Sequence, residues 1–249
     1  MRSLIRFLFL AVSAMVFSCA LPSFSQNITI GVEDIEYFPI YANRDNGYSG
    51  FARELFDEFG KRYNYTIEYK ILPIKRLYQE FLSGRVDLKF PDNQYWAQDK
   101  KEGKTITYSE EVLKYIDGVM VSPNHANSDK DFLKKLGILR GFTPWDYLDD
   151  QKAGIVTVHE SSTLKSLIKQ TLAGRIDGVY FNVLVARYYM KHTFFEENAL
   201  VFNSQLPHSE SSYFLSTATK PEIITHFNEF MSQHRALVDQ LKDKYELHF

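Results

Sequence analysis

Two stretches of this sequence repeat the same order of residue types, and the second begins 90 positions after the first. FLSGRVDLKF runs from Phe81 to Phe90, and TLAGRIDGVY runs from Thr171 to Tyr180. Each pattern predicts the end of a helix, a glycine in a left-handed turn and the start of a strand. A generic helix–strand joint accounts for the leucine and the glycine but does not require the shared Arg-x-Asp. The duplication therefore predicts two related βαβ units, one in each of two α/β lobes with mostly parallel sheets.

Strand and helix patterns alternate through the rest of the chain, as two such lobes require. Alternating or β-branched runs predict strands, and apolar residues spaced three and four apart predict helices. Ser161 and Ser162 are N-cap candidates for the helix before the second joint. The predicted strands cover residues 27–34, 65–72, 85–90, 115–123, 154–162, 175–181 and 211–220, and the predicted helices cover 50–64, 74–82, 162–173 and 220–245.

The first 25 residues have the layout of a secretory signal peptide. Arg2 and Arg6 precede an apolar run over 7–17, which is shorter than the roughly 20 residues that span a bilayer. Small residues then permit cleavage after Ala20 or after Ser25. We therefore expect a signal peptide at 1–25 and a periplasmic protein. Two alternatives are an uncleaved membrane anchor and a lipoprotein modified at Cys19.

Composition after the leader excludes several classes of protein. Cys19 is the only cysteine, so a chain cleaved beyond it has neither a disulfide nor a catalytic thiol. Removing the two leader arginines leaves 27 basic and 31 acidic residues, a formal charge of −4, which argues against a nucleic-acid partner. No later segment is apolar enough to cross a membrane, so we expect a soluble mature protein.

Motifs that carry catalysis or bind metals are missing from the sequence. There is no GxSxG or HExxH, and none of the seven histidines has another four positions away, as a helical metal site would require. The neighbouring carboxylates at 149–150 and 196–197 are interpreted as solvated surface. We therefore expect no catalytic residue, no metal and no cofactor.

Five segments in order resemble the bacterial extracellular solute-binding proteins of family 3, which serve amino-acid ABC importers. They are residues 28–64, the first joint, ITYSEEVLKYIDGVMV at 106–121, LGILRGFT at 136–143, and LAGRIDGVYFN at 172–182. The resemblance implies a type II periplasmic-binding-protein fold with a ligand cleft between two lobes. It places lobe 1 at 26–120 plus 211–249 and lobe 2 at 121–210. It also implies a monomer that captures a small polar solute and delivers it to an inner-membrane ABC permease. The alternatives are a ligand-sensing accessory protein for a membrane receptor, or a cyclohexadienyl-dehydratase-like enzyme.

Position and resemblance together nominate residues for the cleft. In open α/β sheets the ligand lies beyond the carboxyl ends of the strands, where helix N-termini offer free N–H groups. The resemblance adds a cleft-facing role for Arg76, and a carboxylate-holding role for Arg140 and Thr143. The predicted ligand-binding residues are Glu33, Tyr37, Phe38, Arg76, Phe90, Asp92, Asn93, Trp96, Arg140, Thr143 and Asn182.

Two departures from the family pattern leave the ligand open. Relatives carry an arginine shortly before the pair found here as Tyr108-Ser109, but this segment offers only Lys100, Lys101 and Lys104. Lysine lacks the planar fork that grips a carboxylate. Relatives also place an aspartate, for the ligand's amino group, where this chain has the neutral Asn182. We therefore expect an amino acid or a related small polar metabolite. The Arg-x-Asp residues of both joints, at 85, 87, 175 and 177, are predicted to be structural.

Overall fold

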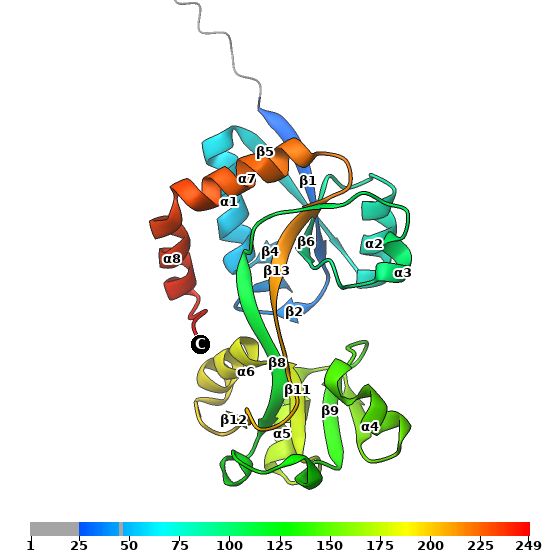
Figure 1. Ribbon diagram of the computed structural model, residues 1–249. Helices are drawn as coiled ribbons and strands as arrows, with labels where there is room; N and C mark the ends of the chain where they lie inside the picture. Colours follow the sequence, from blue (N-terminus) through cyan, green and yellow to red (C-terminus); the bar gives the residue numbers. More distant parts are fainter. Residues whose placement is uncertain (1–24, 45–46) are drawn as a thin grey trace, which may run out of the picture.

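The computed structural model describes residues 25–44 and 47–249. Two lobes lie one above the other, and two long strands run between them (Figure 1). The predicted signal peptide and Cys19 lie outside the described residues, apart from Ser25 at the end of the leader. Among the described residues, none of the helices combines the length and the apolar character that a membrane-spanning segment requires.

The upper lobe contains the N-terminal elements and the C-terminal helices, and the lower lobe contains the middle of the chain (Figure 1). The upper lobe comprises β1 (Gln26–Glu33), β2 (Glu36–Tyr37), β3 (Tyr41–Arg44), β4 (Gly47–Ser49), α1 (Phe51–Tyr63), β5 (Tyr65–Leu72), α2 (Ile74–Leu82), β6 (Leu88–Asp92), α3 (Gln98–Lys101), β7 (Thr107–Tyr108), α7 (Pro221–Gln233) and α8 (Arg235–Lys244). The lower lobe comprises β9 (Lys135–Leu139), α4 (Leu148–Lys152), β10 (Thr157–Ser161), α5 (Leu164–Leu172), β11 (Gly178–Asn182), α6 (Val183–Tyr189) and β12 (Val201–Phe202). The crossing strands are β8 (Leu113–Val121) and β13 (Ser209–Thr217).

The sheets are parallel inside each lobe and antiparallel where the chain crosses. β1 pairs in parallel with β5 and β6, and β9 pairs in parallel with β10 and β11. β8 and β13 pair with each other in antiparallel register; the other end of β13 then joins β6, and the other end of β8 joins β11. Backbone pairing is thus continuous through both lobes although they are separate bodies in space. The predicted two-lobe α/β fold is confirmed.

The crossing strands also carry the predicted lobe boundaries. The expected divisions at 120/121 and 210/211 fall inside β8 and β13. Because the first half of each strand pairs with the other crossing strand and the second half pairs within a lobe, no single residue divides the two bodies. An ordered two-stranded link, not a flexible tether, therefore sets how the lobes sit.

The two duplicated joints have the same backbone structure. Gly84 and Gly174 have φ angles of 72° and 65°, in the left-handed region that favours glycine. In each joint, the arginine N–H donates to the carbonyl oxygen five residues earlier, at 2.9 Å in both copies. The repeated sequence therefore encodes a repeated C-terminal helix stop.

The aspartate of each joint accepts hydrogen bonds from the backbone of a neighbouring strand, inside β1 for Asp87 and at the start of β9 for Asp177. A carboxylate oxygen of Asp87 accepts from the backbone N–H of Thr29 at 2.8 Å. A carboxylate oxygen of Asp177 accepts from the backbone N–H groups of Lys134 and Lys135 at 2.8 and 2.7 Å. In the upper lobe Lys220 adds an ion pair to Asp87 at 2.8 Å. These contacts explain why the joint repeats Asp as well as Gly.

Three details of the sequence prediction are wrong. The strands after the joints begin at Leu88 and Gly178, because the Arg-x-Asp residues are used in the turn. The N-cap of α5 is Thr163, whose side chain accepts from the Ser166 N–H at 3.2 Å; Ser161 is instead paired in β10. The single C-terminal helix is divided into α7 and α8 at His234.

Buried apolar side chains form one cluster that extends through both lobes and a smaller one within the lower lobe. The large cluster joins Phe56 and Phe227 of the upper lobe to Val179 and Phe181 of the lower lobe. The lobes are therefore in contact in this conformation, and that contact locates the candidate site.

Candidate functional site

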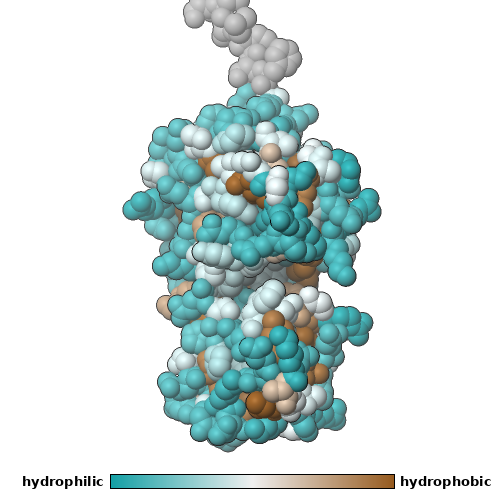
Figure 2. Space-filling view, turned by 45° about the vertical axis from the view of Figure 1, so that its right-hand side comes forward, coloured by the Kyte–Doolittle hydropathy of each residue, from teal (hydrophilic) through white to brown (hydrophobic). Residues whose placement is uncertain are grey.

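Tyr37 is a buried aromatic side chain at the contact between the two lobes. It ends β2 of the upper lobe, and its ring lies 5.3 Å from that of Tyr41 in the same lobe. The same ring lies 5.9 Å from Phe142 and 5.1 Å from Phe181, both in the lower lobe. Tyr37 is 3% exposed, so the contact excludes solvent. Figure 2 shows a mostly hydrophilic outer surface, with a waist between the lobes.

The crossing strands form an aromatic wall behind Tyr37. Tyr115 of β8 stacks on Tyr213 of β13 with 4.4 Å between ring centres, and Trp96 lies 6.0 Å from Tyr213. The Tyr213 hydroxyl accepts from the Asn182 side-chain amide at 3.3 Å and also hydrogen-bonds with Tyr37. Tyr213, which the sequence did not nominate, therefore links the wall to both lobes.

Asn182 is fully buried and both ends of its amide are engaged. Its Oδ1 accepts from the Val185 N–H at 3.1 Å, which makes it the N-cap of α6, while its Nδ2 donates to Tyr213. An asparagine at this position stabilises the helix start but contributes no charge. The predicted location at the end of the strand is correct, and the capping role was not foreseen.

Glu33 ends β1 and lies beneath the aromatic contact. It is 6% exposed, and its carboxylate accepts from the Tyr41 hydroxyl at 2.7 Å. Burial raises the pKa of Glu33, and this outweighs the attraction of Lys89 and the Tyr41 hydrogen bond, which both lower it. Lys89 and Tyr41 therefore offset only part of the cost of burying the Glu33 carboxylate.

Asp92 ends β6 and is held by two buried lysines. Its carboxylate accepts from Lys101 at 2.8 Å and lies 3.4 Å from the Lys89 ammonium. It also accepts from the Ser216 hydroxyl at 2.6 Å and from the backbone N–H of Asn93 at 2.9 Å. Burial by itself raises the pKa of Asp92, but the lysines and hydrogen bonds prevail and hold that pKa below its usual value.

This network also shows whether Lys100 or Lys101 is free to replace the carboxylate-binding arginine of the relatives. Lys101 is 8% exposed and donates to Asp92 and to the Asn93 carbonyl oxygen at 2.7 Å, so its ammonium is already bound. Lys100 lies on the exposed side, 5.4 Å from the Tyr78 ring. In this conformation Lys101 serves Asp92, not an external carboxylate.

Asn93 ties the loop after β6 to the crossing strand. Its side-chain amide donates to Ser211 Oγ at 3.0 Å and to the Ser212 carbonyl oxygen at 2.9 Å, and its Oδ1 accepts from the Tyr95 N–H. The nearby Trp96 ring is half-buried against the wall. These predicted residues therefore lie at the edge of the aromatic contact.

Asp117 is the charged residue at this interface that the sequence reasoning missed. It lies on β8, and its Oδ1 is sealed from solvent with no hydrogen-bond partner among the described residues. Burial, with a smaller contribution from the nearby Asp146 carboxylate, raises the pKa of Asp117 to about 7. The alternation of Tyr115 and Asp117 on a predicted strand was the available signal, because it places both on one face.

The other nominated residues lie outside this contact. Arg76, Arg140 and Thr143 are exposed; Arg76 is 3.9 Å from Glu80, and Arg140 is 3.9 Å from Glu160. Of the remaining two, Phe90 is buried and Phe38 is partly buried in a separate contact between the lobes. Phe90 packs in the upper core against Phe56 at 5.1 Å, and Phe38 packs against Tyr188 of α6 and Tyr245 near the chain end.

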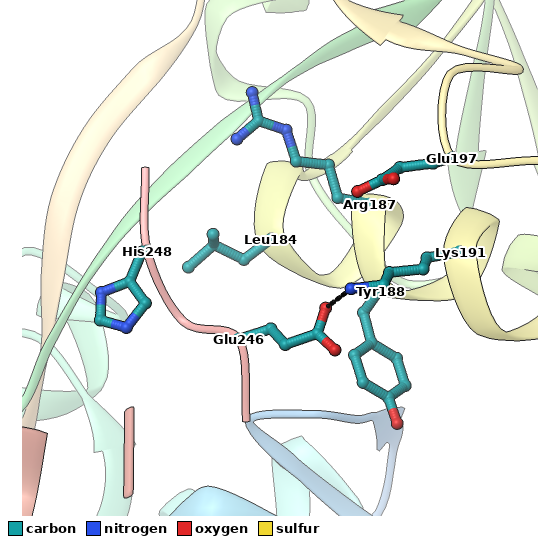
Figure 3. A pocket seen from close by; sticks show the side chains of 7 residues that line it. All are labelled: Leu184, Arg187, Tyr188, Lys191, Glu197, Glu246 and His248. Atoms are coloured by element: carbon teal, nitrogen blue, oxygen red, sulfur yellow. Dashed lines mark hydrogen bonds and ion pairs between the residues drawn. The ribbon is translucent and has the colours of Figure 1, made fainter. Parts of the chain in front are cut away.

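A second contact between the lobes involves the chain end. Glu246 pairs with Lys191 at 2.8 Å (Figure 3). It also pairs with His192 at 3.0 Å. Glu246 and Lys191 border a pocket of about 220 Å³ lined by residues of α6, the segment after it and the C-terminal tail. Its lining includes none of the predicted site residues. In the part of the chain that the structure describes, no cluster of three or more His, Cys, Asp or Glu is arranged to hold a metal ion.

Comparison with known proteins places this arrangement in a structural class. No protein-family model matches the chain. A Vibrio harveyi protein assigned as an amino-acid ABC transporter-binding protein, PatH, is 27% identical over 117 residues. That match covers 47% of this chain and 45% of PatH, so it spans less than half of the relative's length.

Solved structures resemble the chain over most of its length. A Streptococcus pneumoniae ABC uptake substrate-binding protein with bound histidine has 21% identity and a TM-score of 0.68, covering 88% of this chain and 92% of that one. A histidine kinase sensor domain has 16% identity and a TM-score of 0.67, with 89% and 96% covered. An ancestral amino-acid-binding precursor of cyclohexadienyl dehydratase has 20% identity and a TM-score of 0.65, with 88% and 94% covered. The resemblance inferred from the sequence is therefore confirmed, and the chain has the two-lobe fold of the amino-acid-type periplasmic binding proteins.

Proposed function

We propose that this chain is a solute-binding protein that closes its two lobes on a small polar solute, an amino acid or a related metabolite, and delivers it to an ABC importer. Its work is capture, not catalysis. The fold shared with amino-acid-binding proteins and the partial match to PatH support this function.

The observation that carries the proposal is the contact of Tyr37 with Phe142 and Phe181 across the lobes. Separating the lobes about the crossing strands would expose these rings together with the polar groups behind them. A ligand that entered and then closed the lobes would be held by stacking and hydrogen bonds in a site without bulk water. Excluding water strengthens each polar contact, so closure favours capture.

The predicted leader sets the compartment and the partner. A signal peptide at 1–25 would export the chain to the periplasm, where an inner-membrane ABC permease would receive its ligand. The protein would act as a monomer, because both halves of the proposed cleft come from one chain.

A second candidate is a periplasmic sensor accessory that presents the bound ligand to a membrane receptor. The likeness to a histidine kinase sensor domain favours keeping it. An enzyme related to cyclohexadienyl dehydratase is the third, supported by the likeness to a binding-protein precursor of that enzyme. The three candidates differ in the step that comes after ligand binding, which is uptake, signalling or turnover.

A thermal-shift screen of residues 26–249 tests capture directly. The panel comprises amino acids, polyamines, organic acids and sugars. One chemical class should raise the melting temperature, because a ligand at 100 times its Kd adds about 2.7 kcal/mol to the folded state. No shift with any class would contradict the proposal, and chemical conversion of the bound compound would favour the enzyme.

A pair of phenylalanine variants locates the binding site. Phe142→Ala removes a ring from the interlobe contact and should weaken binding of the identified ligand at least about tenfold, because stacked aromatic contacts add to the burial of the ring. Phe195→Ala is the matched control, since Phe195 is 85% exposed, and it should leave affinity unchanged. Equal affinity in both variants would place the ligand elsewhere. Loss of ligand uptake on gene deletion would then separate transport from sensing.

A further inference from the structure

Asp117 occupies the centre of the crossing, where three strands meet. In the antiparallel register it lies directly opposite Asn182 of β11 on one side and Ser209 of β13 on the other. Directly opposed residues of an antiparallel pair project from the same face. Asp117, Asn182 and Ser209 therefore share one face of the wall between the lobes.

One oxygen of the Asp117 carboxylate receives no hydrogen bond from the described residues. Its Oδ1 is buried and has no hydrogen-bond partner among residues 25–44 and 47–249. A buried carboxylate oxygen without a donor carries a desolvation cost that a native structure normally avoids. The same burial, together with the nearby Asp146 carboxylate, raises the pKa of Asp117 to about 7. A group left in this state at an interface between lobes is available for a donor that comes from outside.

The charged neighbour that acts on Asp117, Asp146, does not supply that donor. Asp146 is also acidic, and its carboxylate already accepts from the Tyr180 hydroxyl at 2.7 Å and from Ser209 Oγ at 2.8 Å. The other titratable neighbours are hydroxyls of tyrosines on β2, β8, β11 and β13, at positions 37, 115, 180 and 213. None of these groups brings a positive charge.

Aromatic faces together with a carboxylate recognise one kind of ligand group. The rings of Tyr37, Phe142 and Phe181 approach one another across the lobes, and aromatic faces attract cations. A protonated nitrogen placed there would donate to the free oxygen and would offset the repulsion from Asp146. A neutral or acidic group would leave the oxygen unpaired or add like charge.

We propose that Asp117 binds a protonated nitrogen, an ammonium or a guanidinium, of the solute captured between the lobes. This inference rests on the proposed function. Asp117 thereby supplies, from the neighbouring strand, the negative charge that the amide of Asn182 does not provide. The solutes selected are those with a cationic nitrogen that reaches the crossing strands.

Matched ligand pairs test this assignment at pH 8 by calorimetry. In each pair hydroxyl replaces cationic nitrogen: phenylalanine with 3-phenyllactate and leucine with 2-hydroxyisocaproate differ in one nitrogen, and putrescine with 1,4-butanediol differs in two. Wild type should bind at least one nitrogen-bearing member more tightly than its partner. Asp117→Asn should weaken that binding at least about thirtyfold and change binding of the hydroxyl partner by less than about threefold. A circular-dichroism melt of the variant verifies that it is folded.

The outcomes separate the two proposals. Failure of wild type to bind any compound, in these pairs or in the wider screen, overturns the proposed function and this inference with it. Capture by wild type that is equally tight in Asp117→Asn, or that needs no cationic nitrogen, overturns this inference alone.

A rescue variant separates charge from shape. Asn182→Asp added to Asp117→Asn restores a carboxylate directly opposite, on the same face, and aspartate caps a helix as well as asparagine does. The double variant should regain at least about tenfold of the lost affinity for the nitrogen-bearing ligand. A double variant that binds no better than Asp117→Asn would contradict a role for the negative charge.

Discussion

Two aspartates, the fully buried Asp92 and the partly buried Asp117, have opposite environments in the same protein. Asp92 receives two lysine ammonium groups, a serine hydroxyl and a backbone N–H, and its pKa is lowered. Asp117 has an oxygen with no donor among the described residues, and its pKa is raised to about 7. The first is complete within the upper lobe, whereas the second lies between the lobes.

The difference distinguishes a structural acid from one that is available to a ligand. Burial pushes the pKa of both groups upward, and only the supply of donors decides the result. Asp92 would gain nothing from a ligand cation, because Lys89 and Lys101 already neutralise it. Asp117 would gain both a hydrogen bond and a counter-charge. The same substitution should therefore have opposite effects at the two positions.

The largest effect is expected from Asp92→Asn. This change keeps the size of the side chain but leaves Lys89 and Lys101 buried without their carboxylate, and breaking a buried pair from one side costs roughly 3 kcal/mol or more. Urea unfolding at pH 7 should show a correspondingly lower free energy of unfolding. A midpoint equal to that of wild type would contradict the view that Asp92 holds the lobe together.

Asp117→Asn should stabilise the protein at high pH. The folded-state pKa of about 7 lies above the usual aspartate value of about 3.9, so the folded state binds the extra proton between these values. Wild-type stability therefore falls as pH rises from about 4 to 7, and the loss is complete above that range. The variant avoids this loss and should gain up to about 4 kcal/mol at pH 8.

The same variant provides its own control at low pH. Near pH 4 the gain should almost vanish, because Asp117 is then neutral in the folded protein. Urea midpoints of both proteins, measured across pH 4 to 8 without ligand, give the difference curve. A flat difference, or destabilisation at pH 8, would show that Asp117 has a donor in solution.

The smallest effect concerns Glu33, an intermediate case with a single hydroxyl donor. Tyr41→Phe removes the 2.7 Å hydrogen bond to Glu33 and should cost about 1 kcal/mol of folding stability. Tyr48→Phe is the matched control, because the buried Tyr48 hydroxyl has no hydrogen-bond partner among the described residues. Thermal melts should show a lower midpoint for the first variant only. Equal midpoints would mean that the Tyr41 donor is dispensable.

Much of the fold could be predicted because its signals are local. The glycine stops at 84 and 174 and the alternating strands depend on residues close in sequence, and their repetition predicted the two lobes. The error at the start of α5 arose because two neighbouring residues could both serve as its N-cap. Thr163, not Ser161, became the N-cap because Ser161 is held in the β10–β9 pair.

The candidate site was predicted in part. Tyr37 and Asn182 follow strand ends, where pattern and resemblance directed attention, and the structure brings them to the same interface. Arg76, Arg140 and Thr143 follow strands as well, yet the structure leaves them exposed. A position near a strand end does not determine the direction in which a side chain points.

The alternation of strands and helices, the duplicated joint and hence the pair of lobes could be read from the sequence, because they follow from hydrogen bonds and apolar spacing within a few residues. Which acid is satisfied depends on contacts between residues far apart in the chain. The Ser216 hydroxyl that completes Asp92 lies 124 positions away in the chain, and the groups around Asp117 come from three other strands. The charge state of a buried group depends on hydrogen-bond donors that folding brings to it, and a local sequence pattern does not reveal these donors.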